Sequence, residues 1–108
     1  MEKTLLGRFY FKRTANGNLI GEFSNNIDLI IFTESAIAQT TTKNYVGKYN
    51  STWLENNEPQ FANLEISPKP TTLDRIFIIE WKSKDGRNFI GEGMLCEEIL
   101  IGDYRETP

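Results

Sequence analysis

Glycine recurs in this chain at the head of one tripeptide, in which a charged residue and then an aromatic residue follow it. The four copies are Gly7-Arg8-Phe9, Gly21-Glu22-Phe23, Gly47-Lys48-Tyr49 and Gly102-Asp103-Tyr104, and Gly91-Glu92-Gly93 is a variant. Each copy lies in a stretch with the alternating pattern of a β-strand. Glycine weakens a strand unless the backbone must bend sharply or another segment must approach closely. Since a closing barrel needs such bends around its wall, the pattern predicts one small, strongly coiled antiparallel barrel.

The alternation of apolar and polar residues predicts seven or eight strands. They cover residues 5–13, 19–24, 27–34, 44–55, 61–66, 72–82, 88–95 and 99–104. Asn16-Gly17 and Asp85-Gly86 have the composition of tight hairpin turns. The expected fold class is therefore all-β, a closed or nearly closed antiparallel up-and-down barrel that forms a single domain over residues 1–108.

Three segments are predicted to interrupt the strands. The Thr-rich residues 35–43 are expected to form a longer connection, with room for a short helical turn over residues 35–39. Residues 56–59 and 67–70 contain proline, which favours loops over the interior of a sheet.

Charge and composition narrow the classes of partner. The chain has 108 residues, a net charge of −3 and no basic run longer than two residues, so we expect no nucleic-acid partner. No apolar run is long enough for a signal peptide or a membrane span, and a single cysteine, Cys96, excludes an internal disulfide. We therefore expect a cytoplasmic protein with no membrane association.

The complete absence of histidine removes most familiar catalytic sites. Ser-His-Asp and Cys-His systems are impossible within the chain, and a zinc site would have only one cysteine and carboxylates to use. No phosphate-binding or dinucleotide-binding motif is present. We expect no cofactor, no metal and no catalytic set, although Glu, Asp, Lys or Tyr could still support acid–base chemistry.

One polar and aromatic set is a candidate ligand site. If Gly47 faces the interior, period-two alternation turns Tyr45, Tyr49, Ser51 and Trp53 inward, and Trp81 joins them from a later strand. Such side chains could hold a small ligand by stacking and a few hydrogen bonds. The alternative is that eight strands leave an interior just wide enough for side chains, so that these rings are core.

Several motifs resemble those of calycins, the group that contains lipocalins and avidins. Gly7-Arg8-Phe9 stands where their first strand carries Gly-x-Trp, and residues 47–53 are similar to an avidin-type strand. Residues 77–81, followed by a hairpin into Ile90-Gly91-Glu92-Gly93, add to this resemblance. It implies a calycin-like closed barrel, and a lipocalin-like open end that binds a small molecule.

Two functions follow as hypotheses. The first is non-enzymatic binding of a small, partly apolar or aromatic ligand in the barrel mouth. The alternative is a protein-interaction module, of the inhibitor or immunity type, that docks through a strand edge or through an acidic rim of Glu55, Glu58 and Glu65. Homodimerisation through the barrel wall is a further expectation, based on the apolar residues predicted to face outward: Val46, Leu54, Ile76 and Ile78.

Overall fold

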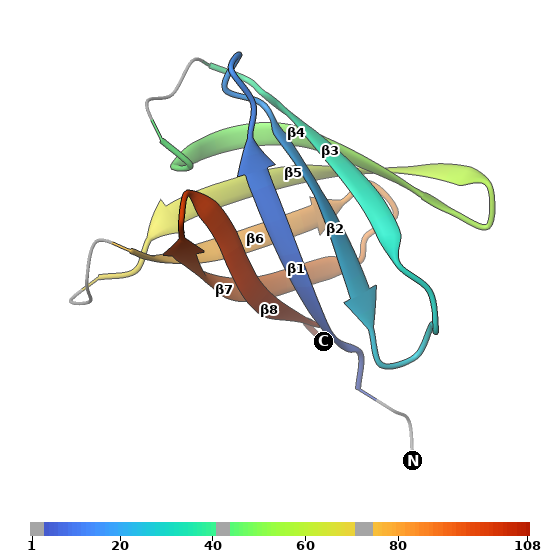
Figure 1. The fold of residues 1–108 in the computed structure, drawn as a ribbon. Helices are drawn as coiled ribbons and strands as arrows, with labels where there is room; N and C mark the ends of the chain where they lie inside the picture. The colour runs from blue at the N-terminus through green and yellow to red at the C-terminus, as the bar shows by residue number, and fades with distance from the viewer. Residues whose placement is uncertain (1–3, 41–43, 71–74) are drawn as a thin grey trace.

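The computed structural model of the protein describes residues 4–40, 44–70 and 75–108, which form eight strands and no helix. The strands are β1 (Leu6–Arg13), β2 (Leu19–Asn25), β3 (Phe32–Ala38), β4 (Gly47–Glu55), β5 (Glu58–Pro68), β6 (Ile76–Ser83), β7 (Asn88–Cys96) and β8 (Ile99–Glu106). Each pairs antiparallel with its neighbours in chain order, and β1 also pairs with β8 (Figure 1). The predicted all-β up-and-down barrel is confirmed, with eight strands.

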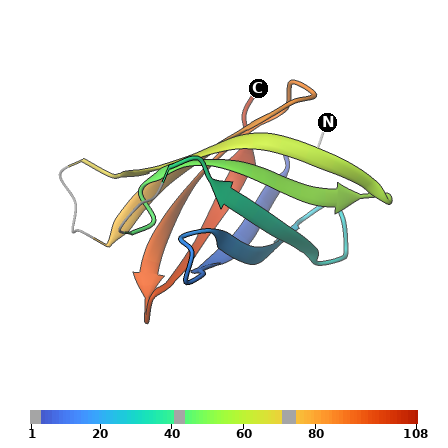
Figure 2. The ribbon, with the colours of Figure 1, turned by 90° about the horizontal axis from the view of Figure 1, so that it is seen from above.

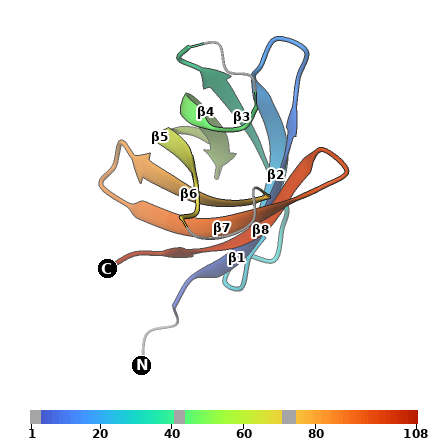
Figure 3. The same cartoon turned by 90° about the vertical axis from the view of Figure 1, so that its left-hand side faces the viewer.

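The barrel is closed and strongly coiled. In Figure 1, β1 and β2 cross steeply over β4 to β7, and Figures 2 and 3 show the strands curving around one interior. Closure joins the first and last strands in register, from Leu6 opposite Arg105 to Lys12 opposite Ile99. Because every strand is paired on both sides, the described part of the chain leaves no free sheet edge.

Two of the recurring glycines show why no larger residue fits at these bends. A Cβ atom on Gly21 would lie 1.9 Å from the carbonyl oxygen of Tyr10 on the neighbouring strand β1. One on Gly102 would lie 1.9 Å from the carbonyl oxygen of Glu92 on β7. Both distances are far inside van der Waals contact. The close approach of strands that the glycine pattern predicted is confirmed.

Alternate residues of the strands fill the interior, and one end of the barrel is densely packed. The large side chains with almost no exposure are Tyr49, Phe11, Leu19, Leu64, Ile66, Ile79 and Leu100. Most lie toward the end that carries the β1–β2, β3–β4, β5–β6 and β7–β8 connections. The hydroxyl of Tyr45 lies 2.9 Å from the carbonyl oxygen of Phe11 and 2.7 Å from that of Glu98, which closes this end.

The prediction for the third strand is wrong. It was expected at residues 27–34, whereas β3 runs from Phe32 to Ala38. The Asn25 side-chain oxygen accepts hydrogen bonds from the backbone N–H groups of Ile27 and Asp28, which holds a turn where the strand was expected. The predicted helical turn is wrong too, because residues 35–38 pair with neighbouring strands. Residues 41–43 of that connection lie outside the described residues.

Strand β5 is longer than predicted. It spans Glu58–Pro68, so both proline-containing segments contribute to its ends, where a missing N–H costs little. The preceding turn needs only Asn56 and Asn57, with φ angles of 51° and 64°. Residues 72–74, with which the next strand was expected to begin, lie outside the described residues.

Candidate functional site

A cavity opens at the less densely packed end of the barrel, where the β2–β3 loop and the β4–β5 and β6–β7 turns lie. Its volume is about 40 Å³, which is space for a few water molecules. Leu5, just before β1, lines it on one side, and Asn25 and Asp28 line it from the β2–β3 loop. The up-and-down order of the strands brings these distant segments to the same end.

Five aromatic side chains form the wall of this cavity, and we call them the aromatic cage: Phe23, Trp53, Trp81, Phe89 and Tyr104. Phe23 meets Trp53 and Tyr104 edge to face, with ring centroids 5.9 and 6.1 Å apart. Phe89 meets Tyr104 in the same way at 6.0 Å. Because the rings come from five different strands and contact one another, the closed barrel fixes their positions.

Glu34 on β3 is the one buried acid among the described residues. Alternation along β3 turns it inward between Phe32 and Ala36, and 5% of its surface is exposed. Its Oε2 atom accepts hydrogen bonds from the Ser51 hydroxyl and from the Trp81 indole N–H, the latter at 2.9 Å. Its Oε1 atom accepts none from the described side chains, and the carboxyl group lines the cavity.

Burial governs the ionisation of this site. It raises the pKa of Glu34 from 4.5 to about 7, and the hydrogen bonds from Ser51 and Trp81 oppose part of that rise. The ion pairs of the described chain are Lys69–Glu92, Arg87–Glu55 and Arg87–Glu106, so none of them involves Glu34. Burial also raises the pKa of Tyr104, which keeps its hydroxyl neutral. Glu34 therefore gains or loses a proton near neutral pH.

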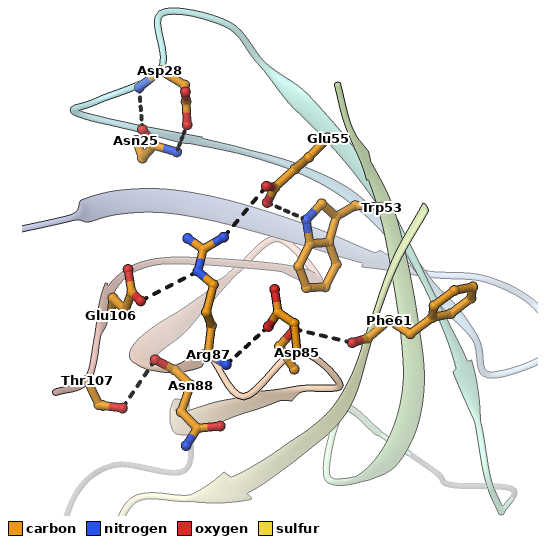
Figure 4. Close-up of polar contacts among 11 residues, drawn as sticks. Asn25, Asp28, Trp53, Glu55, Phe61, Asp85, Arg87, Asn88, Glu106 and Thr107 are labelled. Carbon is orange, nitrogen blue, oxygen red and sulfur yellow. Dashed lines mark hydrogen bonds and ion pairs between the residues drawn. The ribbon is translucent and has the colours of Figure 1, made fainter. Parts of the chain in front are cut away.

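Arg87 lies across the mouth of the cavity between two carboxylates (Figure 4). Its Nη1 atom is 3.6 Å from Glu55 Oε2, and its Nε atom is 3.5 Å from Glu106 Oε2. The Trp53 indole N–H donates to the other oxygen of Glu55 at 2.9 Å. The guanidinium carbon also lies 5.1 Å from the ring centroid of Phe89, within cation–π distance.

The predicted ligand-binding residues divide between the two ends of the barrel. Trp53 and Trp81 line the cavity, and Ser51 lies behind it as a hydrogen-bond donor to Glu34. Tyr45 and Tyr49 lie in the packed end, where the Tyr49 hydroxyl donates to the Tyr45 carbonyl oxygen at 2.7 Å. The structure thus brings two of the five to the cavity and places Ser51 behind it, and ligand binding by the set stays a prediction.

Several cavity residues were not singled out by sequence reasoning, above all Glu34. The predicted strand ended at residue 34, so Glu34 was its last residue. Its inward direction is clear only from the alternation that continues to Ala36. Phe23 and Tyr104 close two of the recurring tripeptides, so the glycine pattern was the available signal for them. Nothing in the sequence distinguishes Arg87 from other turn residues.

The expected acidic rim is dispersed. Glu55 lies in the cavity mouth, Glu58 is exposed opposite it in the β4–β5 hairpin, and Glu65 faces outward on β5 beside Lys48. Of the residues expected to face outward, Leu54 is exposed, while the others are half-buried: Val46, Ile76 and Ile78.

The described residues contain neither a helix that is long and apolar enough to cross a membrane nor a group of three or more Cys, Asp or Glu side chains that could hold a metal ion. Glu34 is the one carboxyl group of the described residues whose pKa is raised by burial, and the carboxylates nearer the mouth are engaged with Arg87 or the β2–β3 loop. The chain matches no protein-family model, no curated protein and no solved structure.

Proposed function

We propose that the protein binds a small, partly apolar molecule at the mouth of the barrel and performs no chemistry on it. The observation that carries this proposal is the cavity itself, an aromatic cage around one buried carboxyl group with an unused oxygen. Ligand sites typically combine apolar walls with a few polar groups that fix orientation. The absence of histidine from the chain supports binding over catalysis.

The proposal extends to the kind of barrel and its location. The eight-stranded up-and-down order, with Gly7-Arg8-Phe9 on the first strand, supports a calycin-like and lipocalin-like relationship. The single exposed Cys96 supports a reducing compartment such as the cytoplasm. Neither point contributes to the argument for a ligand.

Native mass spectrometry of freshly purified protein, repeated after denaturation, tests the proposal. We expect an added mass that is lost on denaturation, and a change in tryptophan fluorescence when the same compound is added back. Both tryptophans of the chain line the cavity, so this signal reports on the site. Trp53→Leu should weaken binding, whereas Tyr49→Phe at the packed end should leave it unchanged. Equal loss in both variants would contradict the proposed place of binding.

A second candidate is a protein-interaction module, and one observation favours it. Outward-facing apolar residues lie next to one another in register across four strands: Ile76, Met94, Ile101 and Tyr10. Met94 and Ile101 are about half exposed, at 53% and 48%. A homodimer or another protein partner on this wall would be weakened by Met94→Ser with Ile101→Ser in sedimentation or pull-down experiments, while ligand binding would persist.

A further inference from the structure

We propose that the cavity binds a primary ammonium group, with the carboxylate of Glu34 as its counter-ion and the aromatic cage as its wall. This inference rests on the proposed function, because it names the chemical class of the ligand for the same site.

The charges around the cavity favour a cation. Asp28, Glu34 and Glu55 are acidic lining residues, and Arg87 is the one basic residue among them. Arg87 is already held by Glu55 and by Glu106, so its charge is largely compensated within the protein. Glu34 has no such partner among the described residues. A buried carboxylate without a counter-ion is costly, and a bound cation would remove that cost.

The walls favour a cation as well. Trp, Tyr and Phe rings attract cations to their faces, most strongly where water is excluded. The mouth already shows this preference, because the Arg87 guanidinium lies over Phe89. Glu34 accepts from Trp81 through Oε2 only, which leaves Oε1 for an N–H donor of the ligand. An ammonium group that reaches Oε1 would therefore lie between a carboxylate and the aromatic cage.

The size of the cavity selects a primary ammonium group. A volume of about 40 Å³ accommodates a group similar to one or a few water molecules and excludes a trimethylammonium group. The apolar body of the ligand would remain in the mouth. Leu5 lines that region, and the adjoining β2–β3 loop exposes Leu29 and Ile31 by 94% and 67%.

Four probes with an unbranched six-carbon chain test the proposal: n-hexylamine, n-hexanol, n-hexanoate and hexyltrimethylammonium. Titration by tryptophan fluorescence and calorimetry would be done at about pH 8, above the pKa of Glu34 and below that of an alkylamine. We expect hexylamine to bind at least about tenfold more tightly than each of the others, as a desolvated cation–π site with a counter-ion predicts. Comparable binding of hexanol or hexanoate would overturn the ammonium assignment but support a ligand site. Binding of none of the four would overturn the ammonium assignment and contradict a site for small alkyl ligands.

Matched variants test which residues produce the preference for hexylamine over hexanol. Glu34→Gln keeps the shape of the side chain and should abolish the preference for hexylamine over hexanol, while hexanol binding stays within about twofold. Glu80→Gln, an exposed change on the outer face of β6, should leave the preference intact. Phe89→Leu should weaken hexylamine more than hexanol. A Glu34→Gln protein that still prefers hexylamine would overturn the role of the carboxylate.

Discussion

At the scale of single residues, Glu34 is a carboxyl group at an inward position of the barrel where an apolar side chain would stabilise the fold more. Its neighbours on the inner face of β3, Phe32 and Ala36, are buried and apolar, as an inward position of a small barrel requires. A carboxyl group at such a position loses hydration and gains only two hydrogen bonds, both to one oxygen. Residues that weaken a fold in this way are typical of functional sites, which is why the proposed function centres on Glu34.

The stability of the protein should depend on pH through Glu34. Its pKa is about 7 in the folded protein and near 4.5 in the unfolded chain. Between pH 4.5 and pH 7 the folded state therefore binds more protons than the unfolded state. The contribution of Glu34 to the free energy of unfolding is therefore greatest below about pH 4.5. It is lost as the pH rises through 7. The free energy of unfolding of Glu34→Gln should therefore fall by about 3 kcal/mol less than that of the wild type over this pH range, since each pKa unit corresponds to about 1.4 kcal/mol.

Urea unfolding of wild type and Glu34→Gln at a series of pH values measures this difference. The charged groups that face the cavity from other elements, Asp28, Glu55 and Arg87, are present in both proteins, so their contributions cancel in the comparison. Parallel pH profiles for the two proteins would contradict the buried, titrating carboxyl group.

The sequence predicted part of the site at this scale and missed its centre. Trp53 and Trp81 could be found because large aromatic residues at alternating positions are readily identified as inward-facing. Glu34 could not, because a carboxylate is normally assigned to the outside of a strand. Its inward direction is clear only from the alternation that continues to Ala36, and the strand predicted over residues 27–34 stopped before that residue.

At the scale of strands, the recurring glycines permit neighbouring backbones to approach where the barrel bends. Gly102→Ala should destabilise the protein by roughly 3 kcal/mol, the upper range for overpacking, because the new methyl group would collide with the Glu92 carbonyl. Ile101→Ala is the matched control. It removes a much larger, half-exposed side chain at the adjacent position, yet should cost less than about 1 kcal/mol. Denaturant unfolding gives both values, and a costlier Ile101→Ala would contradict the close-approach argument.

The turns between strands could be predicted only where the sequence carries residues typical of a turn. Asn16-Gly17 and Asp85-Gly86 identify hairpins correctly, and Gly17 and Gly86 have φ angles of 83° and 91°. The β7–β8 turn instead uses Glu97 and Glu98 at φ angles of 50° and 69°, a conformation that glutamate rarely adopts. Pairing of the flanking strands determines that turn. No glycine, asparagine or aspartate marks it in the sequence, although the predicted strands over residues 88–95 and 99–104 leave a gap there.

At the scale of the whole molecule, the two ends of the barrel differ in what their side chains do. Tyr49, Phe11 and Leu100 fill the packed end, whereas the aromatic cage and Glu34 surround a cavity at the other. The cage residues come from β2, β4, β6, β7 and β8, and the carboxyl group comes from β3. The site therefore exists only when the sheet is closed, so ligand binding and folding are one linked equilibrium.

This linkage predicts that hexylamine stabilises the barrel. At about 100 times its Kd, a ligand specific to the folded state raises the free energy of unfolding by about 2.7 kcal/mol. For a domain of this size that corresponds to a rise in Tm of roughly 10 °C, which thermal unfolding followed by circular dichroism would detect. Glu80→Gln should show the full rise, and Glu34→Gln a much smaller one at the same hexylamine concentration. An unchanged wild-type Tm with saturated fluorescence would mean that the amine contacts a tryptophan without requiring the closed barrel. The cavity would then not be the binding site.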